Sequence, residues 1–260
     1  MIEPWIEAFW RVFSPEPIVI GVIAIAAAGF LRGFVGFGNA ILIVIVFSLL
    51  YGPVFAVPFA VLASLPASIQ LLPTTFREAE RSFVLPFAVA VFAAAPVGAL
   101  VLVAIDPDLL KVGIAFIVLA LVCLLYRDWR PARALNAGGL AAIGVGAGLV
   151  QGMAGAGGMV VAAAALARPG TPAQQRANTI GGITAVGLCN LPPFVYYGLF
   201  TREVVLLSLI MVPVYLAGTW VGSRHFTRRG GGHYRNAALF VLAAVGLVAL
   251  GVSLRAIMVG

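Results

Sequence analysis

One arginine of this chain stands inside an apolar stretch beside a group of glycines, a combination that favours anion binding. Arg32 belongs to the sequence AGFLRGFVGFGNA at residues 28–40. A guanidinium forms paired hydrogen bonds with oxyanions, and an arginine at the centre of a membrane helix costs about 2.5 to 3.5 kcal/mol on insertion. Something must compensate that cost, so we expect Arg32 to face an anionic substrate. The alternative is that Arg32 lies near the lipid headgroups and extends its side chain to them.

The same glycine spacing returns later in the chain. Residues 147–159 read AGLVQGMAGAGGM, so that Gly29, Gly33, Gly36 and Gly38 match Gly148, Gly152, Gly155 and Gly157, and Gln151 matches Arg32. Glycine weakens a helix interior, so each copy predicts a broken helix. Unwound backbone exposes N–H groups, and the following half-helix presents its positive N-terminal end, both of which suit an anion. The alternative is that small residues allow close helix packing, as in the G-x-x-x-G pattern of Gly29 and Gly33.

We expect the substrate site to combine both glycine copies with polar residues of the segments that follow them. Ser64, Ser68 and Thr184 belong to those segments, and such side chains either donate to a substrate or bond to neighbouring helices. The residues expected to bind substrate are Arg32, Gly36, Phe37, Gly38, Asn39, Gln70, Gln151, Gly155, Gly157, Gly158, Asn178, Thr179 and Asn190.

Composition places the whole chain in a lipid bilayer. Of its 260 residues, 62% are hydrophobic and 10% are charged, and the mean hydropathy is +1.10, so the chain could not cover a soluble globule with polar surface. Apolar segments occupy 17–50, 54–72, 83–105, 109–126, 136–167, 174–199, 203–223 and 235–256. One crossing takes about 20 residues. The two segments that carry the glycines are too long for one crossing, and each should turn back, as a re-entrant hairpin or as two crossings.

The expected fold is an all-α polytopic membrane protein made of two inverted-topology repeats, each opening with a glycine-broken helix or hairpin. The repeats span 17–126 and 136–256. Residues 1–16 are expected to form an interfacial amphipathic helix, and the polar residues 127–135 to form a cytoplasmic linker between the repeats.

The distribution of positive charge favours this doubled-back topology. With both glycine segments turned back, one face carries Arg11, Lys111, Arg202 and Arg255, whereas the other carries Arg77, Arg81, Arg127, Arg130, Arg133, Arg168, Arg176, Arg224, Arg228, Arg229 and Arg235. Lys and Arg concentrate in cytoplasmic loops. We therefore expect the arginine-rich loops inside and both termini outside, in a cell inner membrane. The net charge of +7 then requires no nucleic-acid partner.

Two copies of this glycine motif, each opening one half of the chain, resemble the TauE/SafE family of anion transporters, also called sulfite exporters. The resemblance covers nearly the whole chain. It implies secondary transport, without ATP hydrolysis, of sulfite, sulfonates or related organosulfur anions, usually outward. Members often have a third consecutive glycine and then a proline, whereas here Asn39 follows Gly38 and neither copy has that proline. These departures leave the substrate open.

No catalytic or metal-binding arrangement is expected. Cys123 and Cys189 stand alone in apolar segments, His225 and His233 belong to a basic loop, and no G-x-S-x-G or Ser–His pattern appears within the segments. We therefore expect no cofactor and no enzyme activity, but a secondary transporter with alternating access around a site formed by the two glycine motifs. The alternatives are an anion channel, a non-transporting scaffold or, less favoured, an intramembrane enzyme. The expected partners are a small anion and the bilayer; a homodimer, the direction of transport and a coupling ion stay open.

Overall fold

The computed structural model describes residues 15–106 and 137–229 continuously, and single positions between 109 and 123 and between 240 and 251. Within these residues every regular element is a helix, as expected. The interfacial helix expected at 1–16, apart from its last two residues, and the linker expected at 127–135 lie outside the described residues. Those two expectations therefore stay predictions.

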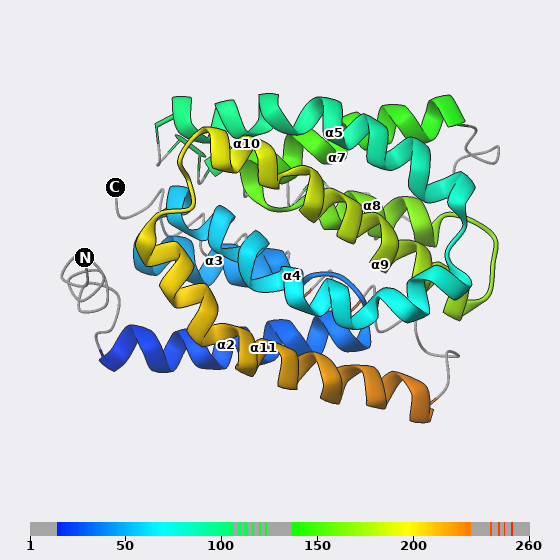
Figure 1. The fold of residues 1–260 in the computed structure, drawn as a ribbon, viewed down its shortest axis with the longest axis horizontal. Coiled ribbons are helices and arrows are strands. Elements are labelled where there is room, and N and C mark those ends of the chain that lie inside the picture. Colours follow the sequence, from blue (N-terminus) through cyan, green and yellow to red (C-terminus); the bar gives the residue numbers. More distant parts are fainter. Residues whose placement is uncertain are drawn as a thin grey trace.

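The described helices follow one another in two sets (Figure 1). The first set is α2 (Pro15–Phe34), α3 (Asn39–Tyr51), α4 (Pro53–Glu78) and α5 (Arg81–Ala104); the second is α7 (Ala137–Ala154), α8 (Gly157–Leu166), α9 (Pro172–Cys189), α10 (Leu191–Tyr196) and α11 (Arg202–Arg229). Five of these helices, α2, α4, α5, α7 and α11, are long and apolar enough to cross a membrane.

Each glycine copy interrupts a helix, as the sequence predicts. Residues 35–38 separate α2 from α3, and residues 155–156 separate α7 from α8. Gly36 and Gly38 have φ angles of 95° and 86°, and Gly155 has a φ of 66°, a region that side chains with a Cβ rarely adopt. The chain can therefore reverse at these points, and Figure 1 shows α3 returning beside α2.

The earlier glycines of each copy pack helices together, as the alternative interpretation of the motif predicts, whereas anion binding by the later glycines stays a prediction. α2 packs along α11, and α7 packs along α5. A Cβ on Gly29 would meet the carbonyl oxygen of Tyr215, and a Cβ on Gly152 would lie 2.8 Å from the carbonyl oxygen of Ala95. The two pairs of helices therefore touch backbone to backbone.

The same contacts recur in both halves with their partners exchanged. The first helix of each set packs against the last helix of the other set, and α4 and α9 pack against each other between them. In Figure 1, α2 runs from left to right and α7 runs from right to left, which is the arrangement that two inverted repeats would produce. Inversion across a membrane stays a prediction.

Candidate functional site

A cavity lies between the two glycine breaks. It is lined by the start of α3, the middle of α4, the α7–α8 break and part of α9. Its volume is about 30 Å³ for the centres of water-sized molecules, which is room for about two waters, since one needs roughly 10 to 15 Å³ on that measure. The cavity is thus sized for a small ligand.

Two helices begin at this cavity. The first turn of α3, including Ala40 and Ile41, and the first turn of α8, including Gly158 and Met159, belong to its wall. Neither helix has a side-chain cap at its N-terminus. The first N–H groups of a helix have no partner within the helix and carry partial positive charge, so both helix starts favour an anion in the cavity.

Arg32 stands directly behind the cavity wall. Its side chain is only 1% exposed. Nη1 donates to the carbonyl oxygen of Gly36 at 2.7 Å, and Nη2 donates to Oγ of Ser68 at 3.1 Å and, at the limiting distance of 3.5 Å, to Oγ1 of Thr184. Ser68 lines the cavity. Arg32 therefore acts on the cavity through a hydroxyl and through its charge rather than by lining the cavity itself.

The charge of Arg32 has no acidic partner among the residues that the structure describes. Its hydrogen-bond partners are one carbonyl and two hydroxyls, and its Nε is buried without a partner in the described part of the chain. A buried cation without a counter-charge is costly. The free energy that an anion would gain here is correspondingly large.

Arg176 is a second buried arginine at the first break, and the sequence analysis assigned it only to a cytoplasmic loop. Its side chain is 5% exposed, and Nη2 donates to the carbonyl oxygen of Gly33 at 2.5 Å. Arg32 and Arg176 thus bind carbonyls on both sides of the point where α2 ends. Cations are favourable at a helix C-terminus, so both arginines also stabilise the break itself.

Tyr215 is a further residue that the sequence analysis missed. It is fully buried on α11, and its Oη accepts a hydrogen bond from Nδ2 of Asn39 at 2.7 Å. Asn39 lines the cavity. A tyrosine in the middle of the apolar segment 203–223 was the available signal, because a buried phenol hydroxyl needs a hydrogen-bond partner.

The structure gathers some of the predicted site residues at the cavity and places others elsewhere. The predicted residues that line it are Gly38, Asn39, Gln151, Gly155 and Gly158. Gly36 and Phe37 belong to the first break and Gly157 begins α8, and none of these three lines the cavity.

The remaining predicted residues lie on α4, α9 and the junction of α9 with α10. Gln70 is exposed on α4. Asn178 is bonded to Glu80, Thr179 donates to the carbonyl of Gln175 at 2.8 Å, and Asn190 donates to the carbonyl of Val186 at 2.9 Å. Substrate binding by any of these residues stays a prediction. In the described part of the chain, no group of three or more His, Cys, Asp or Glu side chains is placed to hold a metal ion.

A comparison with known families decides which class of protein carries this site. The family described as sulfite exporter TauE/SafE matches residues 21–249. The chain belongs to the TauE/SafE family. The match confirms the resemblance seen in the glycine motifs, and no curated protein and no solved structure matches the chain. TauE/SafE proteins are transporters, and the five long apolar helices agree with a multi-pass membrane protein. The TauE/SafE match includes both glycine breaks and the whole cavity wall.

Proposed function

We propose that this chain is a secondary transporter of a small anion of the sulfite or sulfonate class, which it binds in the cavity between the two glycine breaks. The observation that carries the proposal is Arg32, a buried cation that has no acidic partner among the described residues. Its Nη2 donates to the hydroxyl of Ser68, and Ser68 lines the cavity. Two helix N-termini without side-chain caps add positive potential at the same place.

The chemistry of the wall agrees with a small oxyanion. Ser64 and Ser68 contribute hydroxyls, which in the structure donate to the carbonyl oxygens of Val61 and Ser64, and Gln151 contributes an amide. A hydroxyl can rotate its proton to another acceptor, so donors can approach an anion from α4 and from α7. Charges attract more strongly in a site from which water is excluded. The positive charge of Arg32 therefore favours an anion in the cavity over a cation.

We further propose alternating access around this cavity. The cavity lies where α4 of the first half packs against α9 of the second, so a rocking motion of one half against the other would expose it to each side in turn. The end of the molecule that holds the α4–α5 and α8–α9 links carries Arg168 in the second link and Arg77 and Arg81 in the helices beside the first, and we assign this end to the cytoplasm.

Coupling to a proton is not needed for export. Moving two negative charges out of a cell at 100 mV is downhill by about 4.6 kcal/mol. Each acidic residue that the structure describes, such as Glu78 or Glu203, stands at or near a helix end rather than beside the cavity. A uniporter therefore satisfies both the energetics and the residues present.

Flux measurements in proteoliposomes test the proposal. We expect saturable uptake of sulfite or methanesulfonate, which Arg32→Gln lowers by roughly 10-fold or more, since opposite unit charges roughly 8 Å apart attract by about 2 kcal/mol at an effective dielectric constant of about 20. Arg202→Gln is the matched control, because Arg202 is exposed at the start of α11, and it should leave flux unchanged.

Two results would contradict the proposal. Flux of neither anion above that of empty liposomes would remove the transporter function. Flux that rises linearly with concentration, without saturation, would favour the channel alternative.

A further inference from the structure

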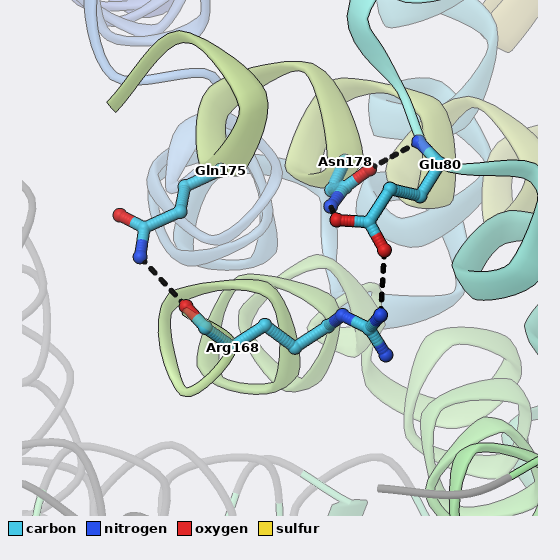
Figure 2. Close-up of polar contacts among 4 residues, drawn as sticks. All are labelled: Glu80, Arg168, Gln175 and Asn178. Atoms are coloured by element: carbon cyan, nitrogen blue, oxygen red, sulfur yellow. Dashed lines mark hydrogen bonds and ion pairs between the residues drawn. The ribbon is translucent and has the colours of Figure 1, made fainter. Parts of the chain in front are cut away.

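Four polar residues meet where the α4–α5 link approaches the α8–α9 link (Figure 2). Nη2 of Arg168 lies 2.5 Å from Oε2 of Glu80, and Nδ2 of Asn178 lies 3.5 Å from Oε1 of the same carboxylate. The backbone N–H of Glu80 donates to Oδ1 of Asn178 at 2.7 Å, and Nε2 of Gln175 donates to the carbonyl of Arg168 at 2.9 Å. Glu80 thus ties the first half of the chain to the second.

Arg168 uses only part of its hydrogen-bonding capacity to bind the carboxylate of Glu80. A guanidinium offers Nε and Nη donors in a fork that matches an oxyanion, but Arg168 uses only Nη2 for Glu80. Its Nε is buried and has no hydrogen-bond partner in the described part of the chain. A free oxyanion could engage both nitrogens, so Arg168 would bind it more fully than it binds Glu80.

The side chain of Glu80 makes no hydrogen bond to its own helix. Glu80 directly precedes α5 and its carbonyl accepts from the first turn, but its carboxylate makes no capping bond. The carboxylate turns instead towards Arg168 and Asn178, which belong to the other half. Both side chains of the ion pair are 22% exposed, so a solute can reach them.

This cluster and a contact of Arg32 belong to the same helix, α9. Asn178 and Thr184 are six residues apart on α9, which is about 9 Å at roughly 1.5 Å per residue, and Thr184 contacts Arg32. Arg77 and Arg81 stand at the same end of the molecule, where their positive charges attract anions. An anion that enters from this end therefore meets Arg168 before it meets Arg32.

We infer that Glu80 closes this end of the transport path as a tethered substitute for the substrate. Its carboxylate occupies an oxyanion site formed by Arg168 and Asn178, and an incoming anion that takes this site releases the α4–α5 link from the α8–α9 link. The inference rests on the proposed anion transport, and it adds an entry site and a trigger for opening.

Thiol labelling tests the inference without measuring transport. A reporter cysteine at Ile180, which is fully buried on α9 between the cluster and Arg32, is placed in a chain whose Cys123 and Cys189 are replaced by serine. A membrane-impermeant maleimide is added to inside-out vesicles and, in parallel, to intact cells. Methanesulfonate is the anion, since sulfite itself consumes maleimides.

In the reporter chain with Glu80 intact, labelling should be slow and should rise with methanesulfonate. Glu80→Gln should make labelling fast without the anion, on the order of 10-fold or more, since one charged hydrogen bond is lost, and from one side of the membrane only. Glu78→Gln is the matched control, because Glu78 is exposed two residues earlier, and it should change nothing. A second reporter cysteine, placed at Ala177, which is also buried on α9, keeps the test valid if the Ile180 variant misfolds.

Labelling of Glu80→Gln at the rate of the intact reporter chain would overturn the inference. So would faster labelling from both sides together with a lower melting temperature, since that result means a merely structural ion pair. Either outcome leaves the proposed function standing if anion flux persists. Loss of that flux in the unmodified protein is the separate result that contradicts the proposed function.

Discussion

Asn39 connects the cavity wall to the opposite half of the molecule. It occupies the first residue of α3, where it lines the cavity, and its amide is held by the hydroxyl of Tyr215 on α11. Nδ2 of Asn39 donates to the hydroxyl oxygen of Tyr215, so Tyr215 fixes the orientation of the Asn39 side chain at the cavity wall and acts as a positioning residue.

Tyr215→Phe should raise the KM for the transported anion several-fold and leave the maximal rate nearly unchanged. The reason is that Asn39 loses a buried hydrogen bond of about 0.5 to 1.5 kcal/mol while the cavity keeps its shape. Initial rates over a range of anion concentrations in proteoliposomes measure the effect. Tyr196→Phe is the control, because Tyr196 is 83% exposed. An unchanged KM in Tyr215→Phe would show that the pair does not position Asn39 for substrate.

At the scale of the elements, the glycines of the repeated motif have two different roles, which are close helix packing and chain reversal. Gly148 and Gly152 let α7 touch α5, whereas Gly155 lets the chain turn at the end of α7. The packing glycines hold the helices that frame the cavity, and the turning glycine places the start of α8 at its wall. A substitution at a packing glycine should therefore have a different effect from a substitution at the turning glycine.

Gly152→Ala should destabilise the protein, whereas Gly146→Ala on the same helix should not. A Cβ at Gly152 would lie 2.7 Å from the backbone nitrogen of Ala99, but a Cβ at Gly146 would have nothing within 4 Å. Overpacking costs about 1 to 3 kcal/mol, whereas alanine in an open helical position gains about 0.5 to 1 kcal/mol. Melting in detergent, followed by size-exclusion chromatography, measures the difference. Equal melting temperatures would mean that α5 and α7 are not in backbone contact.

At the scale of the whole molecule, the arrangement of the helices separates two ends. The α3–α4 junction lies at the left of Figure 1 and the α8–α9 link lies at the right. These two connections follow the two glycine-broken hairpins, so they occupy equivalent positions in the two sets of helices. In inverted repeats, equivalent connections face opposite sides of the membrane.

Single cysteines at Val54 and Ala173 should therefore label from opposite sides. Both positions are exposed in the described structure. With Cys123 and Cys189 replaced by serine, an impermeant maleimide should modify Val54→Cys in intact cells and Ala173→Cys only in inside-out vesicles. Modification of both from the same side would contradict the inverted topology and the proposed alternating access.

The sequence alone was sufficient for features that local chemistry controls. Apolar composition places a chain in lipid whatever its tertiary contacts, and glycine interrupts a helix through its own backbone freedom. The two broken helices and the family could be predicted for that reason. Arg32 was also recognisable, since a charge within an apolar segment is costly wherever the helix packs.

Only the tertiary structure decided which polar residues share a site. In a helix that is apolar on nearly every face, no polar stripe marks the side that faces the protein interior, so the rotation of each helix cannot be predicted from its own residues. Packing of α4 against α9 brings Ser68 and Thr184 to Arg32 and leaves Gln70 exposed. It is contacts between distant segments that place Tyr215 on Asn39 and Glu80 on Arg168.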